Sequence, residues 1–355
     1  MSLALGKPAS MEGLRRNNLR AVLRALYRGE ASSRSELALV TGLTKPTVST
    51  LVSELMDEGL VTEQGPGKAS AGGGKRPTLL RFETGARQVV GVSVGDGQAR
   101  GVLSDLAGTV SAMHVTNLNG DPEAAVLEVV AGLNAQLDAR LASVGVGLPG
   151  PLSASVMSEG LSRRLEIPVH AAGRAELGAL GQLAFGGGSD GTLVSIVVDE
   201  SVEVGVCLAG GTVHYGSDLR ALAPGLDWAT IRSEILAALS GAAEEQRPGA
   251  LCLALRSAAA RGDDAAKELV SELASRLGAV LSWVVATLRP SQVALGGPLA
   301  ELGAPFLDLL RLGASARLPV WQMEGVELTV VYTQQVSAMG AVALAVQREL
   351  ELLFG

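Results

Sequence analysis

Hydrophobic residues at helical spacing predict two short helices early in the chain. Ser33 is the expected N-cap of the first helix, and Gly42 suits the left-handed turn that ends it. Thr44 is the expected N-cap of the second helix, which stops at Gly59. The side chains expected to point inwards are Leu37 and Val40 in the first helix and Val48, Leu51, Val52 and Leu55 in the second.

The ends of these helices carry further local signals. Ser33 and Glu36 have the spacing of a capping box, in which Glu36 reaches back to the N–H of Ser33. Residues 60–63 and 77–82 follow as two strands around a glycine-rich loop, with Lys75 and Arg76 near its tip. The pattern from residue 33 to residue 82 therefore predicts a winged helix-turn-helix.

A module of this kind predicts contact with double-stranded DNA. Small hydroxyls and one lysine at the start of the second helix suit a recognition helix in a major groove. A flexible cationic wing can reach phosphate or an A·T-rich minor groove. The alternative is a helical hairpin that serves oligomerisation. The candidate DNA-binding residues are Ser33, Arg34, Thr44, Lys45, Pro46, Thr47, Ser49, Thr50, Lys75 and Arg76.

After residue 82 the pattern changes to buried strands alternating with longer helices. Strands are expected at 89–94, 100–108, 110–115, 143–148, 191–198, 201–208, 211–215, 291–298 and 326–332. Helices are expected at 122–141, 174–184, 228–239, 248–261, 263–288 and 338–353. Two successive three-strand meanders, each followed by helices and another strand, predict a duplicated two-lobed α/β body. Ligands in such bodies bind in the cleft between the lobes.

Charge is distributed unevenly between the predicted winged helix and the predicted body. Residues 1–84 hold 12 Lys and Arg against 8 Asp and Glu, whereas the remainder holds 17 against 28. A basic arm on an acidic body concentrates the attraction for DNA at one end. Part of this basic count lies on a first helix, where a solvated face and phosphate contact are equally good explanations. These arginines are Arg15, Arg16, Arg20, Arg24 and Arg28.

The composition of the chain indicates its class and its cellular compartment. With 47 % hydrophobic and 18 % charged residues the chain is globular. It has no run of about 18 uncharged apolar residues and no signal-peptide pattern at its start, so we expect a cytoplasmic protein without a membrane span. Cys207 and Cys252 lie in apolar contexts and are expected to be buried thiols in a reducing compartment, rather than a disulfide or a metal site.

The whole chain resembles the ROK family (repressors, open reading frames and kinases), in the branch of xylose and N-acetylglucosamine repressors. The resemblance implies a winged helix-turn-helix joined to a sugar-kinase-like body with the actin/hexokinase (ribonuclease H-like) fold. It places the DNA-binding domain at 1–84, one lobe at 85–188 plus 336–355, and the other at 189–335. The matching stretches are residues 43–49, 74–80, 144–151, 167–169 and 294–300.

The first departure from the family pattern concerns ATP. The family's phosphate loop, Asp-x-Gly-Gly-Thr, is replaced by Ser93-Val94-Gly95-Asp96-Gly97. The acid has become Ser93, the phosphate-binding threonine has become Gly97, and Asp96 adds a negative charge near the expected phosphate position. Such repulsion costs several kcal/mol at about 4 Å with an effective dielectric constant of about 20. ATP binding is therefore disfavoured.

The other departures concern the sugar, catalysis and zinc. In the family motif Glu-Asn-Asp-Ala-Asn, the general-base position holds Arg174, which cannot accept a proton at neutral pH, and the sugar-binding Asn position holds Gly173. Residues 217–227 contain neither His nor Cys where the family's zinc motif is expected. The segment 152–166 is short where the family has a loop that closes over the sugar. No catalytic residue, metal or cofactor is therefore expected.

Three functions compete on this evidence: a DNA-binding regulator, most naturally a repressor; a sugar or sugar-derivative kinase; and an oligomeric scaffold that does not bind DNA. The effector of a regulator, carbohydrate-like if one exists, is open. One explanation is that Arg174, together with Arg163 and Arg164, faces an anionic ligand in the cleft. The favoured one is that Arg163 and Arg164 are solvated loop charges and that Arg174 pairs with Glu176 or another surface acid. The candidate cleft residues are Ser93, Asp96, Gly173, Arg174, Gly296 and Gly297.

A homodimer or dimer of dimers is expected, because a single winged helix contacts too few base pairs for specificity. The apolar faces of the helices at 263–288 and 338–353 are the candidates for pairing.

Overall fold

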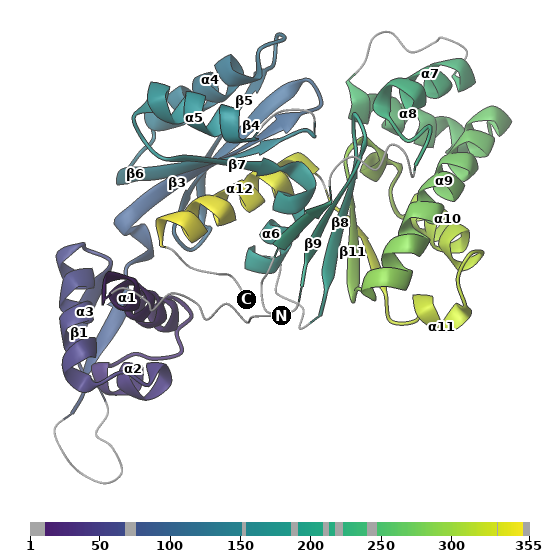
Figure 1. The fold of residues 1–355 in the computed structure, drawn as a ribbon. Helices are drawn as coiled ribbons and strands as arrows, with labels where there is room; N and C mark the ends of the chain where they lie inside the picture. Colours follow the sequence, from purple (N-terminus) through teal and green to yellow (C-terminus); the bar gives the residue numbers. More distant parts are fainter. Residues whose placement is uncertain are drawn as a thin grey trace, which may run out of the picture.

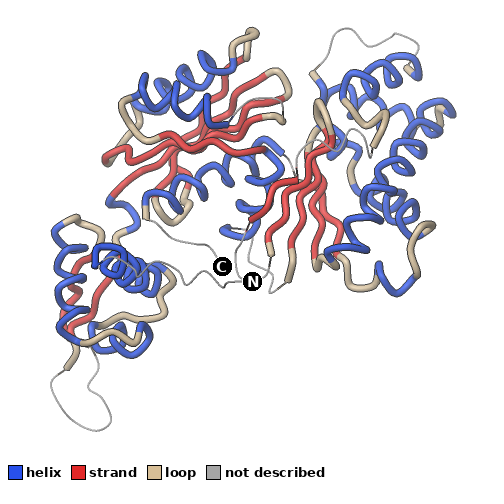
Figure 2. Tube along the Cα trace, in the orientation of Figure 1, coloured by secondary structure: helices blue, strands red, loops and turns tan. Residues whose placement is uncertain are grey.

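The chain forms a winged helix and two lobes, and its last helix returns to the first lobe. The computed structural model describes residues 11–67, 76–150, 154–185, 191–208, 213–216, 223–239, 247–331 and 333–350. A small helical unit with a two-stranded sheet adjoins the first of two lobes, and each lobe is built on a five-stranded sheet (Figures 1 and 2).

The N-terminal unit has the predicted helix order and caps. Ser33 accepts from the N–H of Glu36 at 3.3 Å, and Thr44 accepts from the N–H of Thr47 at 3.4 Å. Gly42 ends the first short helix at φ 69°. The elements are α1 (Met11–Tyr27), α2 (Arg34–Thr41), α3 (Lys45–Asp57), β1 (Val61–Pro66) and β2 (Thr78–Phe82), with β1 and β2 antiparallel.

The capping box is displaced by one residue from its predicted position. Glu36 accepts from the N–H of Ser32 at 2.7 Å and from the Ser32 hydroxyl at 3.0 Å. Ser33 instead forms an isolated β-bridge with Leu79 of the wing strand. The hydrogen bonds from the N–H and the hydroxyl of Ser32 lower the pKa of the Glu36 carboxyl group. The box therefore ties α2 to the segment that enters it.

The first lobe has the strand order β5-β4-β3-β6-β7. The meander β3-β4-β5 is antiparallel, and β6 and β7 run parallel to β3. Helices α4 and α5 cover one face, whereas α12 and α6 lie on the other (Figure 1). The elements are β3 (Arg87–Gly95), β4 (Gln98–Asp105), β5 (Val110–Asn117), α4 (Pro122–Asn134), β6 (Arg140–Leu148), α5 (Ala154–Leu165), β7 (Val169–Gly173), α6 (Arg174–Phe185) and α12 (Thr333–Glu349), with the 3-10 helix η1 (Thr84–Ala86) before β3.

The second lobe repeats this plan with the order β10-β9-β8-β11-β12. Its helices α7 to α11 lie on the far face of the sheet, away from the first lobe (Figure 1). The elements are β8 (Leu193–Val198), β9 (Val202–Cys207), β10 (Val213–Gly216), α7 (Trp228–Ala238), α8 (Pro248–Ala260), α9 (Asp264–Leu288), β11 (Gln292–Gly296), η2 (Pro298–Leu302), α10 (Ala304–Ser315), α11 (Val320–Met323) and β12 (Glu327–Val330).

Three expectations about secondary structure were wrong. The helix expected at 122–141 ends at Asn134, because Gln88 accepts from the N–H groups of Asp138 and Ala139 and so holds this segment as a turn before β6. The short segment 152–166 is not a bare loop, since it contains α5, and β7 follows it. The last helix begins five residues earlier than the expected residue 338, at Thr333.

Helix α12 lies unusually close to its neighbours. A Cβ atom at Gly145 of β6 would lie 1.9 Å from the carbonyl oxygen of Ala341, and one at Gly340 would lie 1.8 Å from that of Leu177 in α6. The hydrophobic residues of α12 from Ala341 to Val346 are buried. The expected dimer face on the last helix is therefore wrong, because this face packs inside the first lobe.

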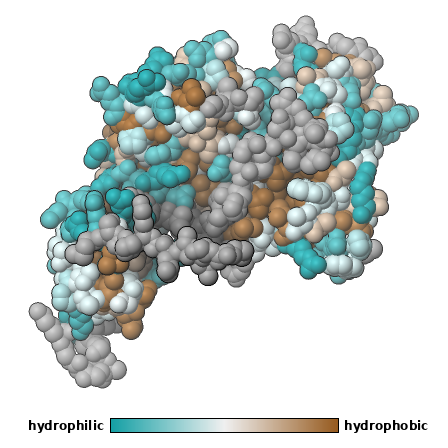
Figure 3. Space-filling model, viewed as in Figure 1, coloured by the Kyte–Doolittle hydropathy of each residue, from teal (hydrophilic) through white to brown (hydrophobic). Residues whose placement is uncertain are grey.

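Helix α9 is long and apolar enough, by composition alone, to cross a membrane. Its apolar residues belong to the core of the second lobe, where they pack with those of α8 and α10. This packing accounts for the composition of α9. On the face drawn in Figure 3, the outer edges of both lobes are mainly hydrophilic, and hydrophobic residues show chiefly towards the middle.

One hydrophobic core joins the winged helix to the first lobe. It contains Leu55 and Leu60 of the winged helix together with Leu106 and the buried face of α12. At the joint, the Tyr27 hydroxyl donates to the carbonyl of Leu106 at 2.8 Å, and its ring meets Phe82 edge-on at 5.4 Å. Burial raises the pKa of Tyr27 to about 12. The N-terminal unit is therefore docked on the body.

We expect Gly340→Ala to destabilise the chain by about 3 kcal/mol or more, since the added methyl group overlaps the α6 backbone and overpacking typically costs about 1–3 kcal/mol. Gly85→Ala is the matched control, because Gly85 has no atom within 4 Å of the added carbon. Urea unfolding followed by circular dichroism measures both variants. Equal stabilities would contradict the tight packing of α12.

Candidate DNA interface and interlobe site

The start of α3 presents a hydroxyl-rich surface. Lys45, Pro46, Ser49 and Thr50 are exposed, and Thr47 is half-buried. The inward residues of the same helix are Val48, Leu51, Val52 and Leu55, all buried as expected. The amphipathic spacing thus turns the polar side of α3 to the surface.

Local hydrogen bonds fix several of these hydroxyls. The Thr44 and Thr47 hydroxyl oxygens lie 2.8 Å apart, and the Thr50 hydroxyl donates to the carbonyl of Pro46 at 3.2 Å. Lys45 has no ion-pair partner among the residues that the structure describes. Hydroxyl groups held in fixed orientations can form hydrogen bonds with base edges, and an exposed cation beside them can contact a phosphate.

Other candidate DNA-binding residues have structural partners. Ser33 is buried, and its hydroxyl caps α2. Arg34 donates to Glu63 of β1 at 2.7 Å. Arg76 is exposed at the base of the wing, whereas Lys75 lies outside the described residues. Among the described candidates, those of α3 and Arg76 are therefore the ones without such a structural role.

A buried ionic cluster joins the two lobes. Arg174, the first residue of α6, is 0 % exposed and donates to Asp199, which follows β8. Its other terminal nitrogen lies 3.7 Å from Asp96 in the β3–β4 turn. Glu203 of β9 is also buried and accepts from the N–H of Gly150 at 2.6 Å. One cation of the first lobe is thus surrounded by acids from both lobes.

Burial and charge shift the ionisation of this cluster. Burial raises the pKa of Glu203 to about 7, with Arg174 opposing the shift. Burial also raises the pKa of Asp199, again against Arg174. For Arg174, burial alone would lower the pKa, but Asp199, Asp96 and Glu203 raise it. Arg174 is therefore a permanent cation, and the pKa of Glu203 lies near neutral pH.

The Arg174 side chain lies against Gly95 beside the β3–β4 turn, the segment that the sequence resemblance aligns with a phosphate loop. A Cβ atom at Gly95 would lie 2.2 Å from a terminal nitrogen of Arg174. The turn itself is a two-residue hairpin in which Asp96 (φ 53°) and Gly97 (φ 75°) are left-handed, as Asp-Gly sequences favour. A phosphate approaching Gly95 would meet this guanidinium group and its bound carboxylates.

These contacts correct both expectations for Arg174. It neither faces an open cleft nor pairs with Glu176 or a surface acid, because its partners are the buried acids Asp199 and Asp96. The negative charge of Asp96 is balanced by Arg174, so simple repulsion does not describe this site.

The remaining cleft candidates divide between the two lobes. Ser93 is buried in β3, and Gly173 ends β7 just before Arg174. Gly296 ends β11, and a Cβ atom at Gly297 (φ 81°) would lie 2.4 Å from the carbonyl of Val198. Gly297 therefore serves close packing within the second lobe.

Sequence reasoning missed Asp199 and Glu203. The signal at Glu203 was a single carboxylate in the otherwise apolar strand Val202–Cys207, which is unusual unless the acid has a buried partner. Asp199 carried no such signal, since an acid after a strand is ordinary in a turn.

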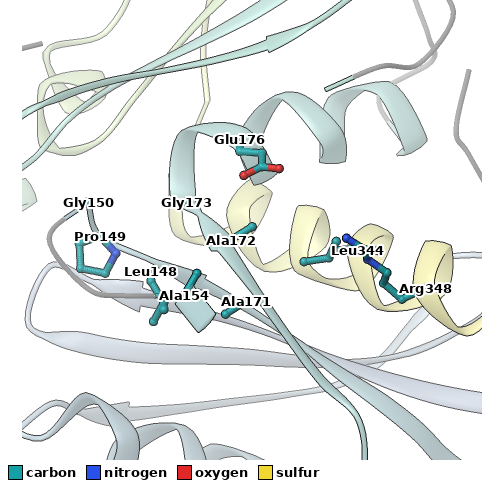
Figure 4. Close-up of a pocket in the computed structure, with 10 residues that line it drawn as sticks. All are labelled: Leu148, Pro149, Gly150, Ala154, Ala171, Ala172, Gly173, Glu176, Leu344 and Arg348. Carbon is teal, nitrogen blue, oxygen red and sulfur yellow. The ribbon is translucent and has the colours of Figure 1, made fainter. Parts of the chain in front are cut away.

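A cavity of about 370 Å³ lies beside the cluster in the first lobe (Figure 4). Its charged residues are Glu176 of α6 and Arg348 of α12. Burial raises the pKa of Glu176, while a hydrogen bond from the N–H of Gly173 and the charge of Arg348 oppose the shift. The other lining residues are Leu148, Pro149, Gly150, Ala154, Ala171, Ala172, Gly173 and Leu344.

Sequence comparison relates the chain to repressors. Residues 20–69 match the MarR family. The xylose repressor of Bacillus subtilis is 26 % identical over 54 % of this chain and 55 % of its own length. That of Caldicellulosiruptor bescii is 27 % identical over 49 % of each chain. The chain thus spans about half the length of these curated relatives.

Structure comparison gives the fold. A ROK family transcriptional regulator, a homolog of the E. coli MLC protein, superposes with a TM-score of 0.75 at 18 % identity, over 96 % of this chain and 98 % of its own. A ROK family glucokinase from Streptomyces griseus, in complex with glucose and AMPPNP, gives 0.57 at 19 % identity, over 72 % of this chain and 98 % of its own. The predicted fold class, a winged helix-turn-helix on an actin/hexokinase-like body, is confirmed.

We expect Glu203→Gln to flatten the pH dependence of stability. Because the folded pKa of about 7 exceeds the unfolded value of about 4.3, folded Glu203 binds more protons, and the free energy of unfolding falls as pH rises between these values. Urea unfolding at pH 5, 6, 7 and 8 measures this fall, with the exposed Glu268→Gln as control. A fall as steep in Glu203→Gln as in the wild type would rule out this role.

Proposed function

We propose that this chain, a homologue of xylose repressors with a MarR-type helix-turn-helix on the ROK regulator fold, is a sequence-specific DNA-binding transcriptional repressor. The observation that carries the proposal is the polar face at the start of α3, where Lys45, Ser49 and Thr50 are exposed on a helix whose opposite side is buried. This arrangement suits a recognition helix that inserts into a major groove.

The charge distribution also favours the N-terminal unit as the end of the molecule that faces DNA. Residues 1–84 carry a net positive charge, and the rest of the chain is acidic. An acidic body is repelled by the phosphate backbone, so the attraction concentrates on the N-terminal unit. Thr44, Pro46, Thr47 and Arg76 complete the proposed interface with the residues of α3.

The proposed repressor acts as a homodimer or a dimer of dimers, because one recognition helix contacts too few base pairs to select a site in a genome. Two-fold pairing would present two copies of α3 to half-sites about one helical turn apart. Trp283 of α9 and Trp321 of α11 are large exposed side chains of the second lobe, and Arg289 lies over the ring of Trp321. Two-fold symmetry is the simplest assembly for such an operator.

A sugar kinase is the less favoured alternative. Arg174 occupies the position that the family resemblance gives to the general base, and a protonated guanidinium group cannot accept a proton at neutral pH. The same side chain lies against Gly95, where a phosphate would approach. A scaffold that does not bind DNA is also less favoured, since Lys45 is kept exposed without an ion-pair partner among the described residues.

The cavity beside Gly173 offers a place for a small-molecule effector of carbohydrate type. Glu176 can accept hydrogen bonds from hydroxyl groups, and Arg348 can donate to an oxygen or an acidic group. Its apolar residues suit the C–H faces of a sugar ring. Effector binding here would act beside α12.

We expect Lys45→Gln to weaken binding to promoter DNA about tenfold, since one charged contact is worth about 1–3 kcal/mol. Fluorescence anisotropy with the full chain and a labelled duplex from upstream of its own gene measures this. Lys267→Gln on α9 removes the same charge from an exposed ion pair of the second lobe and should bind as the wild type. Loss of affinity in both variants, or in neither, would contradict the interface.

We expect no phosphoryl transfer from ATP to any of a panel of hexoses and pentoses, and no thermal stabilisation by Mg-ATP, because Arg174 covers Gly95. Differential scanning fluorimetry with sugars, sugar phosphates and sugar acids should instead identify a stabilising ligand, and Glu176→Gln should reduce its effect. Turnover in a coupled ADP assay would overturn the repressor proposal in favour of the kinase.

A further inference from the structure

Arg87 occupies the junction between the winged helix and the body. It is the first residue of β3, and its side chain is 15 % exposed. One terminal nitrogen contacts Glu58 at 2.9 Å, and the other contacts Glu349 at 2.5 Å. Glu58 is the C-cap of α3, and Glu349 is the last residue of α12. One guanidinium group therefore links the end of the candidate recognition helix to the end of the buried body helix.

We propose that Arg87 is a positioning residue that fixes the orientation of α3 relative to α12, so that the body controls how the recognition helix meets DNA. The inference rests on the proposed DNA-binding function. Arg87 does not itself reach DNA, because both ends of its guanidinium group are held by carboxylates. A planar guanidinium with two separate donor pairs can hold two acids at once, which an ammonium group does less well.

The surrounding contacts leave α3 few other polar ties to the body. The backbone bond from Glu83 N–H to the carbonyl of Leu60 stays within the winged helix, and the Tyr27 hydroxyl bond to Leu106 holds α1. Among the ion pairs between described residues, the Glu58–Arg87 pair is the one that reaches from the end of α3 to the body. Loss of Arg87 should leave the core intact but free the C-terminal end of α3.

Helix α12 connects this junction to the rest of the body. Its N-terminal half packs on α6 through Gly340, and α6 begins with Arg174 of the interlobe cluster. Its C-terminal half carries Leu344 and Arg348 of the cavity, immediately before Glu349. Arg348 and Glu349 are adjacent in the last turn of α12, so a ligand that draws Arg348 into the cavity would disturb the carboxylate that holds Arg87.

The sign of the effect separates positioning from long-range electrostatics. Glu349→Gln removes a negative charge, so a simple field effect would tighten DNA binding. If Arg87 has the proposed positioning role, Glu349→Gln weakens DNA binding instead, because Arg87 loses its partner on the body. Glu123→Gln is the matched control, since it removes a carboxylate of an exposed ion pair with Arg164 on the same lobe.

The experiment compares wild type, Arg87→Gln, Arg87→Lys, Glu349→Gln and Glu123→Gln as full chains on the same labelled promoter duplex at several salt concentrations. We expect Arg87→Gln and Glu349→Gln to lower the affinity for the duplex by roughly 5- to 20-fold. Arg87→Lys should lower the affinity less than Arg87→Gln does, and Glu123→Gln should bind as the wild type. The slope of log affinity against log salt should stay as in the wild type. A slope lowered by about one in Arg87→Gln would make Arg87 a phosphate contact and overturn the proposal.

A second measurement does not require DNA. Spin labels on Ser53→Cys of α3 and Glu128→Cys of α4, both exposed positions, report the distance between the winged helix and the body, and both native cysteines are buried. The distance distribution should be narrow in the wild type and broader in Arg87→Gln. Equal distributions would overturn the positioning role. A wild-type chain that binds no DNA would refute the proposed function, while the label distances would still decide the role of Arg87.

Discussion

The close packing of α12 in the first lobe is the constraint on which the other features depend. Its backbone approaches β3, β6 and α6 so closely that Gly91, Gly145 and Gly340 leave no room for a Cβ atom. Such contact makes the sheet, α12 and α6 one stiff unit, because a packed interior cannot deform continuously. That unit holds Arg174 at one end and Glu349 at the other. The interlobe site and the candidate recognition helix are thus attached to the same element.

The interlobe cluster links the two lobes through buried charges. Burying Arg174 is tolerable only because Asp199 and Asp96 surround it, and replacing such a buried partner leaves an uncompensated charge. The acids come from both lobes, so their attraction to Arg174 holds the lobes together. In this arrangement a cation of the protein lies against Gly95, in the turn that the sequence resemblance aligns with a phosphate loop.

The winged helix depends on local signals to a much greater extent than the body does. Ser33, Thr44 and Gly42 set the helix ends through side-chain caps and a left-handed turn, which act over three or four residues. For this reason the helix boundaries and the polar face of α3 could be predicted closely. In the body, periodicity located the meanders and α9, but it extended α4 into a turn fixed by Gln88 and passed over α5 and β7.

The sequence by itself determined the winged helix-turn-helix, the two meanders and the polar face of α3, since caps and hydrophobic periodicity are encoded within short segments. It also identified Arg174 as an abnormal residue of the cleft, although it gave the wrong partners. Only the tertiary structure decided that Asp96, Asp199 and Glu203 surround Arg174, and that Arg87 joins Glu58 to Glu349. These contacts join residues tens to hundreds of positions apart, and no local pattern specifies which distant carboxylate a buried guanidinium will meet.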